Sequence, residues 1–454
     1  MTKAAVTGSW RGAAYRMDMD SDRIKKTAYW HITDPADPRM QEAGRMIREG
    51  GLVAFPTETV YGLGANGLDA RAVAGIYEAK GRPADNPMIL HVASLTDAKA
   101  LSAHWSENAQ RVTNKLWPGP VTVVVPAAKH IPGIVTAGLD TVAIRYPSDP
   151  VALALIEAAG VPIAAPSANT SGRPSPTRAE HVLEDMDGKI DVIIDGGPCR
   201  VGIESTIIDL SVDPPEILRP GDVTREALRS ALGGVRIGAA GEAAKNVIGE
   251  AEKAAATDST EVTEGRTPKA PGMKYRHYAP KAPTAVLVGE TEVIADYISR
   301  VLHQNNDANE GEEGAETEGF STVDDAVCGA VCGAIKAVVD AGKTGTYRAT
   351  DPLEKRKTGL LLSAETWKIM DVRGLKPNEE NPGFYCRNMG SRLKPKEMGL
   401  LLYDALRACD RADVSYILIE ACSGHGQGEA ILNRLQKAAG GRMIDVSILT
   451  YESQ

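Results

Sequence analysis

Two basic side chains, Lys80 and Arg82, stand together in the stretch "EAKGRPADNPMILHV" and raise the question of which anion they face. They end a predicted helix and are followed by two prolines, by Asn86, and by His91 on an apolar strand. Cations at the C-terminal end of a helix interact favourably with its dipole, which by itself would account for Lys80. The proline after Arg82 and the strand after Asn86 restrict the backbone more tightly than capping requires, so the pair is a candidate anion site.

A polar strip follows the predicted strand "LVAF" in the sequence "PTETVYGLG". It carries the hydroxyls of Thr57 and Thr59, the Glu58 carboxylate and Tyr61. In α/β sheets the ligand crevice lies beyond the ends of strands, so these side chains are expected near a bound ligand.

A second polar run, "AAPSANTSGRPSPT", follows another predicted strand. It concentrates hydrogen-bonding side chains between prolines, at Ser167, Asn169, Thr170, Ser171, Ser175 and Thr177. A serine-rich surface loop is the alternative interpretation of this run. Arg145 in "TVAIRYP" and Arg219 in "ILRPG" add cations among apolar residues, where an arginine usually has an anionic partner because an unpaired buried charge is expensive.

Several cations with many hydroxyl donors and no fixed metal cluster describe a pocket for a phosphorylated nucleotide and a small polar substrate. In phosphoryl or nucleotidyl transfer the protein mainly positions groups and offsets charge. The lack of a dedicated nucleophile is therefore expected.

Three other motifs are weaker. Gly62, Gly64 and Gly67 satisfy the dinucleotide-binding pattern GxGxxG, but "PTETVY" makes the preceding turn too long for that site, so a glycine-permitted loop is predicted. The Gly-Lys-Thr at Gly342 has Ala337 where a phosphate-binding loop needs glycine. Cys328 and Cys332 share a predicted helical face without further ligands nearby, which favours simple packing over a metal site.

The composition is that of an ordinary globular protein. The chain has 454 residues, 43% of them hydrophobic, and 51 basic against 60 acidic residues, for a net charge of -9. Length allows two or three domains, and the charge gives no global attraction to nucleic acid or membrane. Six cysteines without a CxxC pair indicate reduced thiols. With no secretory signal and no run of about 18 apolar residues, the sequence predicts a soluble, cytoplasmic protein.

Alternating helical and strand periods position these residues. Strands are predicted in "LVAFPT", "MILHVA", "VTVVVPA", "TVAIRYP", "VPIAAPSAN", "DVIIDGG" and "STIIDLS", with helices near 40–49, 106–116, 150–159 and 177–187. Asp69 is expected to cap a helix carrying Val73 and Ile76, and Thr177 with Glu180 has capping-box spacing. A second α/β cycle starts at "TAVLVG" and ends with the strand and helix of "SYILIEACSGHGQGEAILNRLQKAA".

This pattern predicts an α/β protein: a twisted mixed sheet with flanking helices, then a linker and a smaller Rossmann-like α/β domain. The boundaries follow the changes in composition. We predict a disordered leader at 1–24, a first domain at 25–235, a linker at 236–283 and a C-terminal domain at 284–454.

The combined motifs resemble the YrdC-type domain of L-threonylcarbamoyladenylate synthases. The matching stretches are "FPTETVYGLG", "KGRP" with "NPMILHV", "WPGPVTVV", "VAIRYP", "APSANTSGRPSPT", "ESTIIDL" and "ILRPG". The segment "APGMKYRHYAP" and the second α/β domain are similar to the long two-domain form, so the resemblance covers about residues 25 to 454. The chain departs from the family in its leader, its Ala- and Glu-rich stretch before residue 270 and its acidic loop at 305–319.

The resemblance implies that L-threonine, bicarbonate or carbon dioxide, and ATP give L-threonylcarbamoyl-AMP and pyrophosphate, for N6-threonylcarbamoyladenosine in tRNA. It implies an L-threonine site at Thr59, His91, Arg145, Ala165 and Ser205. It implies an ATP site at Arg82, Asn86, Thr141, Ser167, Asn169, Ser175, Arg219, Tyr275 and Tyr278, with Lys80 and Arg82 offsetting phosphate charge. Mg²⁺ is expected to accompany ATP without a protein cluster to hold it.

The basic and aromatic segment 274–278 is predicted to fold over the pocket and exclude water from a labile carbamate. The expected partners are the three substrates and the enzyme that transfers the threonylcarbamoyl group to tRNA, with weak contact to RNA and none to membranes. Two alternatives stay open: an RNA-binding module, and a factor that adenylates carbamoyl phosphate. The second would be expected to carry paired CxxC zinc motifs, which this sequence lacks.

Overall fold

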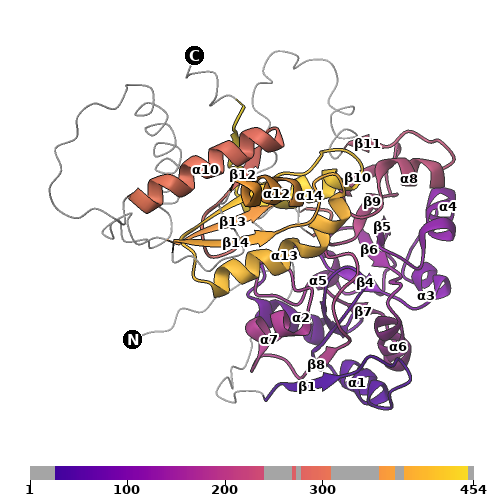
Figure 1. The fold of residues 1–454 in the computed structure, drawn as a ribbon. Coiled ribbons are helices and arrows are strands. Elements are labelled where there is room, and N and C mark those ends of the chain that lie inside the picture. Colours follow the sequence, from indigo (N-terminus) through magenta and orange to yellow (C-terminus); the bar gives the residue numbers. More distant parts are fainter. Residues whose placement is uncertain (1–25, 240–267, 272–277, 308–356, 374–382, 448–454) are drawn as a thin grey trace, which may run out of the picture.

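The computed structural model describes residues 26–239, 268–271, 278–307, 357–373 and 383–447, which form two α/β domains (Figure 1). Several predictions fall outside these ranges: those for the leader at 1–24, Tyr275, the Gly-Lys-Thr at Gly342, most of the acidic loop 305–319, and Cys328 and Cys332. They stay predictions. In the described ranges no helix combines the length and apolar character needed to cross a lipid bilayer.

The first domain is built on an 11-stranded mixed sheet with the strand order β1-β8-β2-β3-β7-β4-β6-β5-β9-β10-β11. The strands are β1 (Ala28–His31), β2 (Val53–Phe55), β3 (Gly62–Asn66), β4 (Ile89–His91), β5 (Val121–Pro126), β6 (Thr141–Arg145), β7 (Ile163–Ala164), β8 (Val192–Asp195), β9 (Thr206–Asp209), β10 (Glu216–Arg219) and β11 (Gly238–Ala239). The predicted twisted mixed sheet with flanking helices is confirmed.

Helices cover both faces of this sheet. They are α1 (Arg39–Arg48), α2 (Ala70–Lys80), α3 (Leu95–Ala100), α4 (Glu107–Leu116), α5 (Gly133–Thr136), α6 (Pro150–Ala159), α7 (Ala179–Met186) and α8 (Arg225–Ala231). On one face Ile47 of α1 and Leu155 of α6 pack around Phe55. On the other, Ile76 of α2 and Val112 of α4 belong to the largest apolar core. The sheet is therefore buried on both sides, as its apolar strands predict.

Helix ends show where local sequence signals hold. The Asp69 side chain accepts a hydrogen bond from the Arg71 amide at the start of α2, and Gly81 ends that helix with φ of 62°, so the predicted cap is confirmed. The capping box predicted from Thr177 and Glu180 is wrong. Helix α7 begins two residues after Thr177, whose amide instead donates to the His181 ring at 3.3 Å.

Gly62 and Gly64 of "GLGANG" lie in strand β3, so the loop predicted there is wrong for these two residues, whereas Gly67 lies in the turn that follows the strand. Gly64 and Gly67 both permit a close approach of neighbouring strands. A Cβ on Gly64 would lie 2.8 Å from Ile163 Cγ2, and one on Gly67 would lie 2.5 Å from Leu90 Cδ2. Larger residues would push apart strands that lie at the centre of the sheet.

The second domain has a parallel five-stranded sheet in the order β14-β13-β15-β12-β16, which confirms the predicted smaller Rossmann-like domain. Its elements are β12 (Thr284–Val288), α10 (Thr291–Asp307), β13 (Thr358–Leu362), α12 (Ala364–Val372), β14 (Phe384–Asn388), α13 (Pro395–Arg411), β15 (Tyr416–Glu420), α14 (Gln427–Ala438) and β16 (Met443–Asp445). Helix α13 lies on the side of this sheet that faces the first domain (Figure 1).

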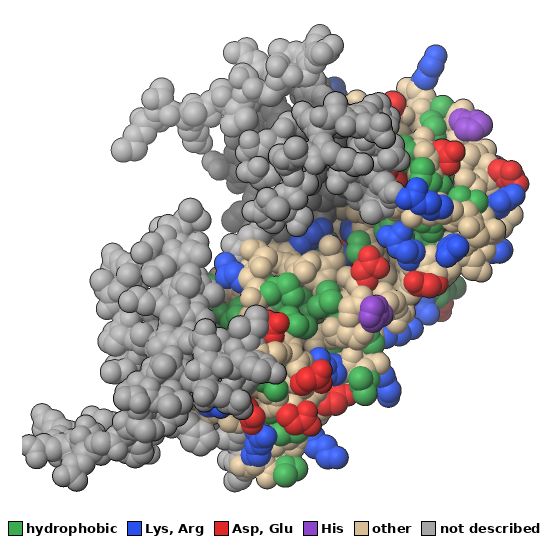
Figure 2. All heavy atoms as spheres, turned by 90° about the horizontal axis from the view of Figure 1, so that it is seen from above, with side chains coloured by type: hydrophobic (Ala, Val, Ile, Leu, Met, Phe, Trp, Pro, Cys, Tyr) green, Lys and Arg blue, Asp and Glu red, His purple; other side chains and the backbone are tan. Residues whose placement is uncertain are grey.

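The two domains share one apolar core. Val60 and Ile203 of the first domain pack in the same cluster as Leu402 of α13 and Ile431 of α14. Acidic and basic side chains intermingle on the described part of the surface seen in Figure 2. That part of this face therefore offers no broad basic area of the kind that binds nucleic acid.

Candidate functional site

The strand directions bring distant residues to one edge of the first sheet. His91 and Arg145 lie opposite each other at the carboxyl ends of the parallel strands β4 and β6. Strand β5 runs antiparallel to β6 and parallel to β9, so Ser205, directly before β9, reaches the same edge. Arg219 ends β10, which is antiparallel to β9, and arrives there as well.

A cavity of about 60 Å³ opens among these side chains. All the residues predicted to bind L-threonine line it, namely Thr59, His91, Arg145, Ala165 and Ser205. So do Arg82, Ser167, Arg219 and Tyr278 from the predicted ATP site. The remaining lining residues are Thr57, Val60, Gly62, Ile89, Pro166, Glu204 and Pro271. The space can hold several water molecules, since one needs roughly 10–15 Å³.

Some buried polar atoms at this cavity make no hydrogen bond to the described residues. Within the described part of the chain, His91 Nδ1 and the Nε and Nη2 atoms of Arg145 have no hydrogen-bond partner. Nη2 lies 2.8 Å from Oε1 of the buried Glu58, close enough for an ion pair but not aligned for a hydrogen bond. Because an unsatisfied buried polar group costs roughly 1–3 kcal/mol, such atoms point to a ligand that supplies the missing bonds.

His91 is uncharged at neutral pH. Burial, followed by the charge of Arg145, lowers the pKa of its imidazole to about 3. A neutral ring can either donate or accept one hydrogen bond through each nitrogen, depending on its tautomer. It can therefore face a substrate amine or hydroxyl without adding charge beside Arg145.

Arg219 supplies positive charge that protein carboxylates do not directly cancel. Its guanidinium donates to the Ser205 carbonyl at 3.1 and 3.0 Å, to Ser205 Oγ at 3.2 Å and to the Pro271 carbonyl at 3.3 Å. Arg82 likewise donates to the carbonyls of Asn86 and Pro87, at 3.3 and 3.0 Å. Two buried or half-buried cations that donate to neutral oxygens favour an anionic ligand.

Glu204 forms a wall of the cavity and binds the second domain. Its carboxylate accepts hydrogen bonds from Ser175 Oγ at 2.5 Å, from Tyr403 OH at 2.9 Å and from Arg434 Nε at 2.8 Å. Burial alone would raise the pKa of Glu204, but the charges of Arg434 and Arg219 together with these hydrogen bonds lower it to about 2. Tyr278 stacks on the Tyr403 ring, with centroids 5.3 Å apart.

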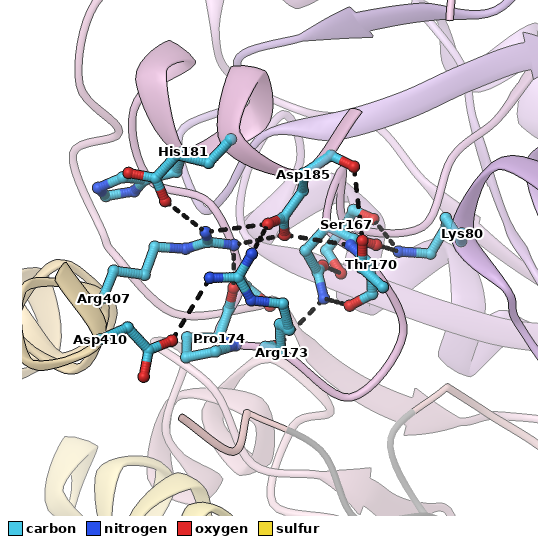
Figure 3. A network of polar contacts seen from close by, with 12 residues as sticks. Lys80, Ser167, Thr170, Arg173, Pro174, His181, Asp185, Arg407 and Asp410 are labelled. Atoms are coloured by element: carbon cyan, nitrogen blue, oxygen red, sulfur yellow. Dashed lines mark hydrogen bonds and ion pairs between the residues drawn. The ribbon is translucent and has the colours of Figure 1, made fainter. Parts of the chain in front are cut away.

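Five predicted site residues do not line the cavity: Lys80, Asn86, Thr141, Asn169 and Ser175. Lys80 is buried, and its amine donates to the carbonyls of Ser167, at 2.5 Å, and Asn169 (Figure 3). Burial, followed by the charge of Arg82, lowers the pKa of Lys80 well below its ordinary value. In this structure Lys80 holds the loop that carries Ser167.

Thr141 and Arg145 mark the two ends of one stripe on β6. Side chains alternate along a strand, so Thr141, Ala143 and Arg145 share a face that extends for roughly 13 Å. Ala143 packs there with Ile89 and with Ala270 from the linker. This packing covers the stripe beyond Arg145, and the cavity does not reach Ala143 or Thr141.

Sequence reasoning missed the contribution of the second domain. Tyr403 and Arg434 approach the cavity wall, and neither had been singled out. A signal was present, because Arg434 stands on an otherwise apolar helical face with Ile431 and Ala438. Tyr61, expected near the ligand, instead packs in the core and donates to the Gly197 carbonyl at 2.6 Å.

The fold and the cavity define a two-domain α/β protein with a polar, arginine-lined cavity at the edge of a mixed sheet. The family model described as "Telomere recombination" matches residues 45–221, and the one described as "Threonylcarbamoyl-AMP synthase, C-terminal domain" matches residues 223–440. The chain belongs to the two-domain threonylcarbamoyl-AMP synthase family.

Relatives match over nearly the whole chain. A Bacillus subtilis protein named threonylcarbamoyl-AMP synthase is 38% identical over 425 residues, covering 92% of this chain and 99% of the relative. A Pyrococcus abyssi protein of the same name is 40% identical over 408 residues, covering 90% and 96%. The solved structure of P. abyssi Sua5 complexed with L-threonine has a TM-score of 0.67 at 37% identity, covering 92% of this chain and 98% of that one.

Proposed function

We propose that this protein joins L-threonine, bicarbonate or carbon dioxide, and ATP into L-threonylcarbamoyl-AMP and pyrophosphate, for the N6-threonylcarbamoyladenosine modification of tRNA. One observation carries the proposal. The residues expected to bind L-threonine surround a single cavity, where His91 and Arg145 hold polar atoms without hydrogen-bond partners among the described residues. The name shared by its relatives and the L-threonine bound to P. abyssi Sua5 support the same activity.

The reaction is a nucleotidyl transfer. The threonine amine captures carbon dioxide as a carbamate, and a carbamate oxygen attacks the α-phosphorus of ATP. The bond from that phosphorus to the bridging oxygen breaks, and pyrophosphate leaves. Arg145 is suited to the threonine carboxylate, while Arg82 and Arg219 offset the charge on the phosphates. The polar loop from Ser167 to Ser175 supplies further donors and acceptors to the nucleotide.

Mg²⁺ is expected to enter with the triphosphate. Among the described residues, no three His, Cys, Asp or Glu side chains come together as a metal site, so the phosphates and water are the expected ligands. Bound Mg²⁺ would neutralise charge on the leaving pyrophosphate. The product would pass to the enzyme that transfers the threonylcarbamoyl group to tRNA.

Pyrophosphate release from ATP by the purified full-length chain tests the proposal, with L-threonine and bicarbonate omitted in turn. Release that requires both supports it. Arg145→Met should then lose most of the activity, whereas Arg39→Met should keep it, because Arg39 is partly exposed and pairs with Asp37 in a local turn. Release that ignores L-threonine but follows carbamoyl phosphate would overturn the proposal, and so would steeply salt-dependent RNA binding without any release.

A further inference from the structure

One polar loop of the first domain, residues 167–175, is held from several sides (Figure 3). Lys80 fixes its beginning through the Ser167 and Asn169 carbonyls. Asn169 closes the loop internally, because its Nδ2 donates to the carbonyls of Thr170 at 2.8 Å and of Arg173 at 2.9 Å. Contacts within the protein therefore hold the shape of the loop that the proposed function assigns to ATP.

Through Arg407 of α13 the second domain reaches this loop directly at Pro174 and, by way of Asp185, at Thr170. Its side chain is completely buried, and Nη2 lies 2.8 Å from Asp185 Oδ2 and 2.6 Å from the Pro174 carbonyl. Asp185 is also completely buried, accepts a hydrogen bond from the Thr170 amide at 3.1 Å and pairs with Arg173. Figure 3 shows Arg407 and Arg173 converging on this one carboxylate.

A second arginine, Arg434 of α14, reaches the end of the loop. Its Nε donates to Glu204, whose other oxygen accepts from Ser175 Oγ. The Arg434 guanidinium also lies 5.5 Å from the centroid of the Tyr278 ring, another wall of the cavity. Glu204 directly precedes Ser205, so this contact reaches the predicted L-threonine site as well.

Domain packing alone does not require these ion pairs. The shared apolar core already joins the domains, and a buried ion pair gains little stability over apolar residues of similar size. Its geometry is restrictive, however, because removing one partner leaves a buried charge without its counterion. Two such pairs, Arg407–Asp185 and Arg434–Glu204, adjoin one loop and fix its position relative to α13 and α14.

We propose that Arg407 and Arg434 of the C-terminal domain are positioning residues for the ATP-binding loop of the first domain. This rests on the proposed function for the identity of the ligand. Arg407 touches the part of the loop associated with ATP alone, whereas Arg434 acts through Glu204 on both substrate sites. Substitution of Arg407 is therefore expected to weaken ATP binding selectively, and substitution of Arg434 to weaken binding of both ATP and L-threonine.

The test measures the dissociation constants of ATP and of L-threonine separately, by calorimetric titration of the full-length chain. Neither titration needs turnover, so failure of the synthase reaction is seen independently in the pyrophosphate assay. Arg407→Met should raise the Kd for ATP at least about tenfold, roughly 1.4 kcal/mol, and change that for L-threonine less than about twofold. Arg434→Met should raise the Kd for ATP and the Kd for L-threonine, each at least about fivefold.

Arg392→Met is the matched control. Arg392 is a largely buried arginine of the same domain, and its side chain bonds within that domain, to the Gly289 carbonyl at 3.0 Å and to Glu420 at 3.3 Å. Its loss should lower the melting temperature yet leave both dissociation constants within about twofold of wild type. An equal loss of ATP affinity in Arg392→Met would show general destabilisation and overturn the proposal.

Two further variants cover the case in which Arg407→Met does not fold. Arg407→Lys keeps the charge but cannot reach Asp185 and the Pro174 carbonyl with a forked group, so an intermediate Kd for ATP is expected. Asp185→Asn with Arg407→Met removes both charges of this buried pair and should still bind ATP weakly, because the loop has lost its contact with the second domain at Pro174. Folded forms of these variants with the wild-type Kd for ATP would overturn the proposal, as would a wild-type chain that binds no ATP.

Discussion

The buried imidazole of His91 gives the protein a specific pH dependence of stability. Its folded pKa of about 3 lies below the ordinary value of 6.5. Between these two pH values His91 binds a proton in the unfolded chain but not in the folded chain. The free energy of unfolding therefore falls as the pH decreases. The contribution is complete above the ordinary pKa and is lost progressively as the pH falls below it. Replacing His91 with Gln, which does not titrate, should remove this contribution.

The size of the effect follows from the two pKa values. Once the pH is below the ordinary pKa, each further pH unit costs about 1.4 kcal/mol, until the folded pKa is reached. A change from a pH of about 8 to about 5 should therefore remove roughly 2 kcal/mol through His91 alone. Other titrating groups add to the pH dependence of both proteins and largely cancel in the comparison.

The assay is urea unfolding of wild type and His91→Gln at both pH values. The wild-type free energy of unfolding should fall by roughly 2 kcal/mol more than that of the variant. Imidazole NMR resonances offer an independent check, because the signal absent from His91→Gln should not titrate over this range in wild type. Identical pH dependence in the two proteins, or a His91 signal that titrates near its ordinary pKa, would refute the reasoning.

Three further substitutions and one control substitution test the site and the loop beside it. Ala165→Val should fill part of the cavity of about 60 Å³ and weaken L-threonine binding at least about tenfold, with ATP binding nearly unchanged in calorimetric titrations. Lys80→Met should lower the melting temperature by several degrees, because two loop carbonyls lose their donor at roughly 1–3 kcal/mol each; an unchanged temperature would contradict its anchoring role. Gly221→Ala should reduce both stability and L-threonine affinity, because the new Cβ would lie 2.7 Å from the Ser205 carbonyl carbon. Gly133→Ala is the control: the new Cβ would have open space around it, so this change should be nearly neutral in the same assays.

The sequence predicts the fold where local and periodic signals agree. Apolar strands buried on both faces, such as Val121–Pro126, and the Asp69 cap are found as predicted. The prediction from sequence fails where contacts between residues distant in the sequence decide the local conformation. The glycines of β3 look like a loop because glycine usually marks one, and the side chains of Phe55 and Ile163 that exclude a Cβ at Gly64 are placed there by the assembled sheet.

The site likewise combines residues that the sequence predicts with contacts that only the assembled fold decides. His91, Arg145 and Ser205 were predicted through family motifs, and they come together because the strand directions bring their ends to one edge of the sheet. Lys80 was predicted to face phosphate, and its type and spacing gave no indication that its amine would be taken up by two loop carbonyls. A motif fixes which residues occur near a ligand, whereas the packed loop decides which atoms point at it.

The predicted boundary divides the chain into two domains, but buried arginines of the second domain form ion pairs with buried carboxylates of the first. Asp185 and Glu204 belong to the first domain, yet each is buried beneath an arginine of the second. Without Arg434, Glu204 would have to take up water or a proton, and without Arg407, Asp185 would keep only Arg173 as its cationic partner. The loop between Thr170 and Ser175 would then lose two of the contacts that fix it. The second domain thus completes the electrostatics of a cavity whose lining residues lie in the first domain and the linker. Its effect on substrate affinity need not involve any direct contact with substrate.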